Sequence, residues 1–269
     1  MPAREIKKNT LMLTFAGGTG SVTGANFLVE GEGITFLVDC GLNQGTKMAD
    51  DKNWEPFPYD PATVDYLFIT HAHIDHIGRI PKLVYDGFKG QIYSTIPTKD
   101  IAHLMLEDTA NILSHNDDDK LKEVYSLKTI EQVMSLWKVI DYHQDLAVGP
   151  YVFRYRDAGH VLGSGMLELI YNNKKIVFTG DLGNSPSPLL RDTEELKNVD
   201  YMLMESVYGD RNHTERAVRR ERLEATIEDN YKRKGTLVIP TFSLERSQEL
   251  LFEIDQLVEH DRVPKMPIF

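Results

Sequence analysis

The sequence predicts a mixed α/β fold in which two β-sheets pack against each other and helices lie outside them. Strand-like apolar runs gather in two blocks, within residues 11–70 and 151–206, and helix-like segments follow each block. Strict alternation of strands and helices would indicate one parallel sheet, whereas grouped strands favour two packed layers. A chain of 269 residues with 41% hydrophobic residues can bury a core of that size.

The first block consists of short apolar runs punctuated by glycine. The expected strands are residues 11–18 (LMLTFAGG), 26–31 (NFLVEG), 34–41 (ITFLVDCG) and 64–70 (VDYLFIT). Apolar residues at helical spacing then predict a short helix that ends near Gly87, a helix over 97–116 and a helix over 129–140. Thr129 and Gln132 have the spacing of a capping box, which places the start of the third helix there.

The second block contains further strands and then changes to charged, helical sequence. The expected strands are residues 151–159 (YVFRYRDAG), 166–171 (MLELIY), 175–181 (KIVFTGD) and 201–206 (YMLMES). Asn172 and Asn173 are expected to form a hairpin turn between two of them. A charged helix is expected over 213–234, followed by a strand at 236–240 (TLVIP) and a helix at 243–260.

The charge balance and the single cysteine limit the class of protein. Lys and Arg number 30 and Asp and Glu number 41, so the formal net charge is −11. This charge disfavours broad, nonspecific binding to nucleic acid but allows a local basic groove. Cys40 alone cannot form an internal disulfide, and no apolar run approaches the length of about 18 residues that a membrane span needs. We therefore expect a cytoplasmic protein without a membrane segment or signal peptide.

The segment THAHIDHIGRIP, residues 70–81, concentrates metal-binding side chains. Directly after an expected strand, six consecutive positions contain His71, His73, Asp75 and His76. Zinc accepts imidazole and carboxylate ligands, and residues two apart in an extended chain can bind one ion. A lone histidine is most often an ordinary polar residue, but four donors in so short a stretch favour a metal site. His71 and His73 would then bind a first ion. Asp75 and His76 would face a second.

Three other strand ends supply candidate partners for this cluster. His160 follows one expected strand between glycines, and Asp181 and Asp39 lie at the ends of two others. Asp39 is suited to orient a ligating histidine, because metal sites commonly use such supporting carboxylates. Cysteine takes no part in the set, which favours a catalytic over a structural zinc site. Two ions about 3.5–4 Å apart can activate water and bind a phosphoryl or acyl oxygen, so hydrolysis is the expected chemistry.

The chain resembles the metallo-β-lactamase superfamily. HAHIDH matches the H-x-H-x-D-H motif of that family, and Asp39, His160 and Asp181 fall at its other motif positions. The resemblance covers about residues 11–208. It implies an αββα sandwich with a two-zinc site on one edge, in which Asp181 bridges the ions.

The resemblance also implies how the other ligands divide between the two zinc ions. One ion would be held by His71, His73 and His160. The other would be held by Asp75 and His76. Asp75 would also be a catalytic residue that orients the attacking water or accepts its proton.

Four segments are similar to the β-CASP branch of this superfamily, a nucleic-acid processing group that includes ribonuclease J and the pre-mRNA 3′-end cleavage endonuclease. They are GGTGSVTGANFLVE, DAGHVLGSG, ESVYGDR and IPTFSLERSQELL. Glu205 falls on the first acidic signature position of the branch, which makes it a second candidate catalytic residue. Family members often have a glycine where this chain has Glu245, so the resemblance assigns no role to Arg246.

The branch also implies a division into a hydrolase domain, residues 1–208, and the truncated start of a β-CASP cap domain, residues 209–269. In that branch the chain later returns to the first domain and supplies a final metal-binding histidine. We therefore expect an incomplete site in which the second zinc binds more weakly, unless water or His260 replaces the ligand. The apolar face within residues 250–258 would also lack partners, so a homodimer is one expected assembly.

The expected function is zinc-dependent cleavage of phosphodiester bonds in RNA, or in single-stranded DNA, by a metal-activated hydroxide. Two alternatives remain open: hydrolysis of a thioester or lactam at the same metal site, and a non-catalytic scaffold subunit in RNA processing. The segments ESVYGDR and IPTFSLERSQELL argue against the first alternative. The complete ligand set up to residue 181 argues against the second.

Two remaining motifs have simpler explanations. Gly18, Gly20 and Gly24 are spaced one residue too widely for a dinucleotide-binding fingerprint, and they precede a strand instead of a helix. The arginine run RNHTERAVRRERLEAT can contact phosphates, but a solvated helix face with a Glu215–Arg219 ion pair explains it more simply.

Overall fold

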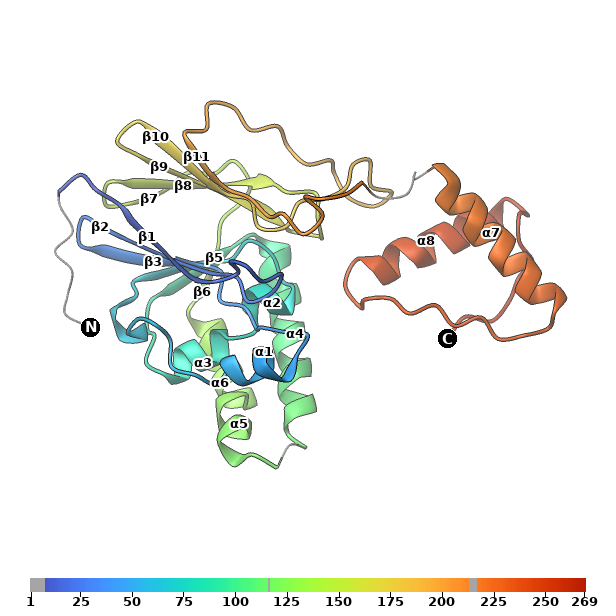
Figure 1. Ribbon diagram of the computed structural model, residues 1–269, viewed down its shortest axis with the longest axis horizontal. Coiled ribbons are helices and arrows are strands. Elements are labelled where there is room, and N and C mark those ends of the chain that lie inside the picture. The colour runs from blue at the N-terminus through green and yellow to red at the C-terminus, as the bar shows by residue number, and fades with distance from the viewer. Residues whose placement is uncertain (1–7, 116, 213–216) are drawn as a thin grey trace. The chain divides into compact units, whose positions relative to one another are not determined.

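The structure, a computed structural model, describes residues 8–115, 117–212 and 217–269, and it divides into two units (Figure 1). The first unit comprises the chain up to Ser185 together with Arg191–Glu205. The second comprises Pro186–Leu190 and Ser206–Phe269. The first unit contains the six candidate ligands His71, His73, Asp75, His76, His160 and Asp181, whereas His260 belongs to the second unit.

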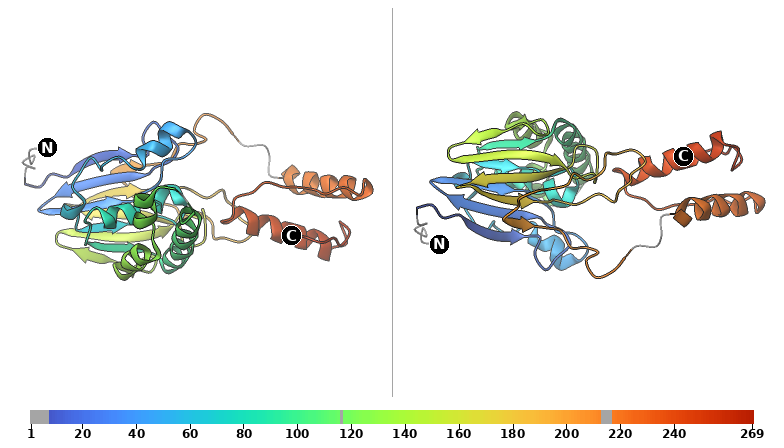
Figure 2. Two further views of the ribbon diagram at one scale, coloured as in Figure 1. Left: turned by 90° about the horizontal axis from the view of Figure 1, so that it is seen from below. Right: turned by 90° about the horizontal axis from the view of Figure 1, so that it is seen from above.

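Two sheets lie face to face in the first unit (Figures 1 and 2). The strands of the first sheet are, in spatial order, β1 (Met12–Gly17), β2 (Asn26–Gly31), β3 (Ile34–Val38), β4 (Tyr66–Phe68), β5 (Gln91–Ser94) and β6 (Trp137–Val139). β1, β2 and β3 pair antiparallel, whereas β3, β4, β5 and β6 run parallel. Parallel strands end at the same edge of a sheet, so the chain leaves β3 and β4 on one side of the molecule.

The second sheet is built mainly from hairpins. Its strands are, in spatial order, β11 (Tyr201–Leu203), β10 (Lys174–Phe178), β9 (Gly165–Tyr171), β8 (Tyr151–Asp157) and β7 (Leu146–Val148). β11 pairs parallel with β10, and the other pairs are antiparallel. Asn172 and Asn173 connect β9 to β10 with φ of 49° and 58°, so the predicted hairpin turn is confirmed.

The helices of the first unit cover the side of the first sheet that faces away from the second (Figure 1). They are α1 (Lys47–Lys52), the 3-10 helix η1 (Pro61–Thr63), α2 (Ile74–Ile77), α3 (Ile80–Tyr85), α4 (Ile96–Leu113), α5 (Asp119–Val124) and α6 (Leu127–Ser135). The layered α/β prediction is confirmed. None of the helices in the described ranges is long and apolar enough to cross a membrane.

The predicted helix start at Thr129 is wrong. The Ser126 side chain caps α6 by accepting a hydrogen bond from the Thr129 N–H, so the helix begins earlier. α6 also ends at Ser135, before strand β6, which the sequence pattern did not predict. The Trp137 indole N–H donates to Ser94 Oγ and anchors β6 beside β5.

Aromatic rings fill the space between the two sheets. Phe36 and Phe68 from the first sheet and Phe153 from the second are fully buried. The ring centroids of Phe68 and Phe153 are 4.1 Å apart in a stacked arrangement, and Phe36 meets Phe153 edge-on at 5.1 Å. Offset stacked and edge-to-face pairs of this kind add to the free energy gained from burial.

The second unit contains α7 (Ala217–Lys232) and α8 (Arg246–Glu259), which pack against each other. Their shared core comprises Ile227, Ile254, Leu257 and Val263. The prediction that the apolar face of the last helix lacks partners is therefore wrong for Ile254 and Leu257. Leu251 and Phe252 are 49% and 37% exposed, and a homodimer formed through them remains a prediction.

Two further predictions fall in this unit. Residues 236–240 form no strand, and Val238 is 80% exposed, because the described part of the chain supplies no strand beside this segment. Residues 213–216, including Glu215 of the predicted ion pair, lie outside the described residues. Arg220 Nε lies 3.7 Å from Glu253 Oε2 of α8, which agrees with a structural explanation of the arginine run.

Replacing Phe153 with alanine should destabilise the first unit by about 3–5 kcal/mol, because the change leaves a cavity between the sheets. Trp54 and Trp137 both lie in the first unit, so urea unfolding followed by tryptophan fluorescence reports on that unit. The control is Leu104→Ala in the same unit, since the Leu104 side chain is 67% exposed and its loss should cost less than about 0.5 kcal/mol. Equal losses in both variants would contradict the role of the aromatic core.

Candidate metal centre

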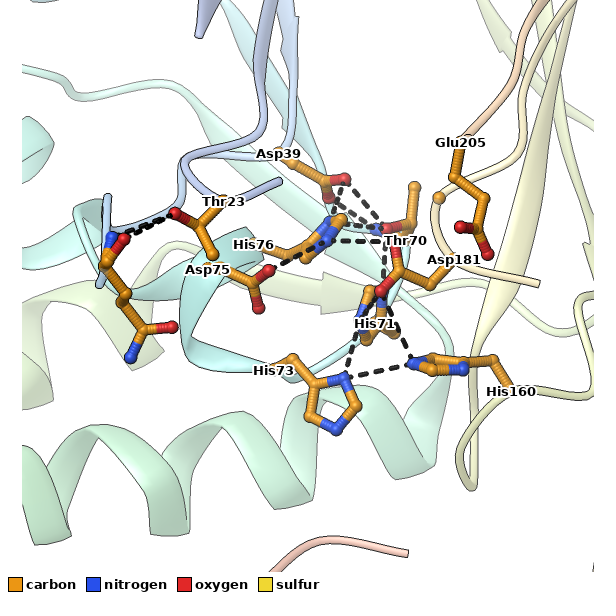
Figure 3. Close-up of polar contacts among 12 residues, drawn as sticks. Thr23, Asp39, Thr70, His71, His73, Asp75, His76, His160, Asp181 and Glu205 are labelled. Carbon is orange, nitrogen blue, oxygen red and sulfur yellow. Dashed lines mark hydrogen bonds and ion pairs between the residues drawn. The ribbon is translucent and has the colours of Figure 1, made fainter. Parts of the chain in front are cut away.

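The candidate ligands lie where strands of both sheets end. His71 and His73 follow β4 of the first sheet. His160 lies between β8 and β9 of the second sheet, and Asp181 follows β10. Because the two sheets are packed face to face, their strand ends meet and the four side chains point toward one another (Figure 3).

The backbone of the histidine cluster is held by the segments next to it. The Ala25 N–H donates to Asp75 O at 3.0 Å, and the Cys40 N–H donates to His76 O at 2.8 Å. Gly41 lies so close to Asp75 that an added Cβ would be 1.5 Å from the Asp75 carbonyl oxygen. Only glycine fits at this position, and the contact fixes α2 against the end of β3.

Three imidazole nitrogens and one carboxylate oxygen converge on one point. His73 Nδ1 lies 3.0 Å from His71 Nε2 and 3.1 Å from His160 Nε2. Asp181 Oδ2 lies 3.8 Å from His71 Nε2 and 3.6 Å from His160 Nε2. The four ligand atoms all lie within 4.8 Å of one another. The structure therefore brings together residues that are more than 100 positions apart in the chain.

Asp181 also reaches a second group of donors. Its Oδ1 lies 3.3 Å from His76 Nε2, and Asp75 Oδ2 lies 3.8 Å from the same nitrogen. The two carboxylate oxygens of Asp181 thus face two different sets of side chains, which is the arrangement that a bridging ligand needs. Among the described residues, the first set offers four donors and the second offers three.

Asp39 orients the histidines from behind. Its Oδ1 accepts the Thr70 N–H at 2.8 Å, and its Oδ2 accepts the Thr70 hydroxyl at 2.8 Å. Asp39 Oδ2 also lies 2.8 Å from His76 Nδ1, which leaves His76 Nε2 to face Asp181. Thr70 Oγ1 lies 3.1 Å from His71 Nδ1, so a hydrogen-bonded path connects His71 to the same carboxylate. These contacts agree with the supporting role expected for Asp39 from the sequence, and that role remains a prediction.

Thr70 is a site residue that the sequence reasoning missed. It is only 1% exposed, and it lies between the Asp39 carboxylate and the His71 ring. The available signal was its position, since a hydroxyl residue at the end of a buried strand directly precedes the first histidine of the motif.

Burial and neighbouring charges set the protonation of the cluster. Burial lowers the pKa of His71 well below its ordinary value and lowers the pKa values of His73 and His160 to about 4. Burial would raise the pKa of Asp181, but the hydrogen bond and positive charge of His76 outweigh it and lower the pKa to about 2. Burial would likewise lower the pKa of His76, but the charge of Asp39 and the hydrogen bond with Asp181 raise it well above its ordinary value.

This donor set fits a metal ion. Ligand atoms around a tetrahedral ion with zinc–nitrogen bonds of about 2.0–2.1 Å lie about 3.3 Å apart. His73 Nδ1 lies 3.0 Å from His71 Nε2 and 3.1 Å from His160 Nε2, close to that separation. The low pKa values of His73 and His160 keep these imidazoles neutral near neutral pH, and the neutral form is the one that binds a metal ion.

Glu205 lies apart from the cluster in Figure 3. Its Oε1 accepts the Leu182 N–H at 2.9 Å, and its own N–H donates to Thr179 Oγ1 at 3.2 Å. Leu182 directly follows Asp181, so in this arrangement the Glu205 carboxylate supports the backbone that carries a candidate ligand. A catalytic role for Glu205 remains a prediction.

The comparison with protein families agrees with this site and fold. The model of the metallo-beta-lactamase superfamily matches residues 20–225. The chain belongs to this superfamily, and the match spans the histidine motif, His160 and Asp181.

Curated relatives confirm the resemblance to the β-CASP branch. Ribonuclease TTHA0252 of Thermus thermophilus is 33% identical over 254 residues, which cover 94% of this chain and 56% of the relative. Transcription termination factor FttA of Methanothermobacter thermautotrophicus is 29% identical, with coverage of 96% and 41%. Endoribonuclease YSH1 of Yarrowia lipolytica is 30% identical, with coverage of 93% and 30%. The chain therefore spans between 30% and 56% of the length of these relatives.

Removing the Asp39 carboxylate should destabilise the metal-free protein strongly. Asp39→Ala leaves the buried His76 and Thr70 without their partner, and loss of one member of a buried ion pair costs about 3–5 kcal/mol. Asp100→Ala, at an exposed position of α4, should change the free energy of unfolding by no more than about 0.5 kcal/mol. Urea unfolding followed by tryptophan fluorescence measures both. Equal stability of the two variants would mean that the Asp39 contacts contribute nothing to folding.

Proposed function

We propose that this protein is a zinc-dependent hydrolase that cleaves phosphodiester bonds in RNA. The main support is the convergence of His71, His73 and His160 on one point, with Asp181 shared between that point and a second donor group. The family and the donor set indicate a metal cofactor. The names of the relatives, which include a ribonuclease and an endoribonuclease, favour RNA as the substrate.

Two zinc ions are the cofactor that we propose. One would be held by His71, His73 and His160. The other would be held by Asp75 and His76. Asp181 would bridge them, because its two oxygens face the two sets. The second ion should bind more weakly, since the described residues offer it fewer donors.

The side chains of this chain would divide the work of hydrolysis. When bound, the zinc ions would supply Lewis acidity that polarises the phosphate and makes water a stronger nucleophile. Asp75 would orient the attacking water and accept its proton. Burial raises the pKa of its carboxyl group, which makes it a better base and supports this role. Asp39 and Thr70 would keep His71 and His76 in orientation throughout the reaction.

Zinc content tests the ligand assignment. We expect up to two zinc ions per chain by elemental analysis, and His160→Ala should lower zinc content because it removes a donor from the first set. The matched control is His103→Ala, since His103 lies on α4 beside Glu107 and outside the cluster. Equal zinc content in His160→Ala and the unchanged protein would reject His160 as a ligand.

Cleavage of labelled single-stranded RNA tests the reaction. We expect a chelator to abolish cleavage and zinc to restore it, and we expect slower cleavage at high salt because phosphate contacts are screened. Asp75→Asn should lower the rate by about 10²–10⁴-fold, the usual contribution of a general base. Asp100→Asn should leave the rate unchanged. Rapid hydrolysis of a thioester without RNA cleavage under any metal condition would instead support a different branch of the superfamily.

A further inference from the structure

We propose that Thr95 and Thr98 are positioning residues for the metal centre, because their hydroxyl groups hold the loop that carries His160. The proposal rests on the proposed function in one respect, namely that His160 binds a metal. It concerns how that histidine is kept in place, and its test requires no RNA.

Both threonines donate to one carbonyl oxygen far away in the sequence. Thr95 Oγ1 lies 2.6 Å from Gly163 O, and Thr98 Oγ1 lies 2.8 Å from the same oxygen, across 68 and 65 residues. A carbonyl oxygen has two lone pairs, so it can accept both hydrogen bonds. Thr95 is 3% exposed and Thr98 is 0% exposed. Water therefore cannot replace either bond, and loss of one hydroxyl leaves the Gly163 carbonyl held by a single hydrogen bond.

The loop that these hydroxyls hold is itself a rigid turn. Ser164 Oγ accepts the N–H groups of His160 and Val161 at 3.0 and 3.2 Å. Tyr142 OH donates to Ser164 O at 2.8 Å. Gly163 has a φ of 87°, and an added Cβ would lie 2.6 Å from Thr98 N, so this residue must be glycine. Because this turn is rigid, the hydrogen bonds that hold Gly163 also hold His160 in position.

The two hydroxyls connect the two halves of the first unit. α4 belongs to the helical layer of the first sheet, and Lys99 Nζ ties it to that sheet by donating to Trp137 O at 2.9 Å. The His160 loop joins β8 and β9 of the second sheet. His71 and His73 come from the first half, so the separation of 3.1 Å between His73 Nδ1 and His160 Nε2 depends on how the halves are linked. Metal sites tolerate displacements of only about 0.5 Å.

Thr98 allows a cleaner test than Thr95. Thr95 also caps α4, because its side chain accepts the Thr98 N–H, so replacing Thr95 would weaken the helix as well. The Thr98 side chain has no capping role, and valine has nearly the same shape as threonine without the hydroxyl group.

The experiment compares zinc affinity among three variants of the full chain, by competition with a chromophoric chelator. Thr98→Val should weaken binding of the tighter zinc ion by about 10–100-fold, the usual effect of losing a supporting hydrogen bond. Thr98→Ser keeps the hydroxyl and should bind zinc nearly as tightly as the unchanged protein. Thr109→Val is the matched control on the same helix, since the Thr109 hydroxyl donates only to Met105 O within α4.

Cobalt binding supplies a second readout that general destabilisation would not change. The visible absorption of the Co²⁺ form reports ligand geometry, and it should change in Thr98→Val but not in Thr109→Val. Unchanged zinc affinity and an unchanged cobalt spectrum in Thr98→Val would overturn the proposal, and so would equal weakening in Thr98→Ser. If the unchanged protein bound no zinc, the proposed metal centre itself would fail. If it bound zinc but cut no RNA, only the proposed reaction would fail.

Discussion

The stacking of Phe68 on Phe153, with ring centroids 4.1 Å apart, sets the distance at which the two sheets meet. Phe68 is the last residue of β4, directly before the segment that leads to His71, and Phe153 lies on β8, the strand that leads to His160. Packed protein interiors resist compression and expansion. The apolar contact in the core therefore fixes the positions of the polar side chains at the edge.

Hydrogen bonds also connect the two sheets beyond the aromatic core. Tyr155 OH donates to Tyr93 O at 3.0 Å, and the Gly165 N–H donates to Thr70 O at 2.8 Å, so both bonds cross from the second sheet to the first. Thr70, which accepts the second of these bonds, also contacts Asp39, and the two residues together orient His71 and His76. A site supported in this way is already organised for its ligand, which reduces the free-energy cost of binding.

The second unit illustrates how strongly a strand depends on its neighbours. TLVIP has the β-branched, apolar composition of a strand, yet Val238 and Ile239 are 80% and 37% exposed and the segment joins no sheet among the described residues. In contrast, β6 and β7 are only three residues long and form strands, because β5 and β8 supply their hydrogen-bond partners. Pairing outweighs local propensity in both cases.

The sequence by itself determined which residues are available at the candidate site. Local sequence patterns identify the candidate ligands without any structure. These patterns are the four metal donors in six positions after an apolar strand and the polar residues at three other strand ends. The strands of the first block, the hairpin at Asn172 and Asn173 and the two-sheet class follow from local patterns in the same way.

Only the tertiary structure decided how these groups meet. His73 turns its Nδ1 toward the other histidines, whereas His71 and His160 turn their Nε2 atoms toward His73, and this orientation depends on the packing of the two sheets. So does the division of the two oxygens of Asp181 between two donor sets. Thr95 and Thr98 carry no sequence pattern that marks a supporting role, since each acts through a hydrogen bond to a residue at least 65 positions away. Such bonds are set by the burial of apolar side chains elsewhere in the molecule, and a local pattern does not contain that information.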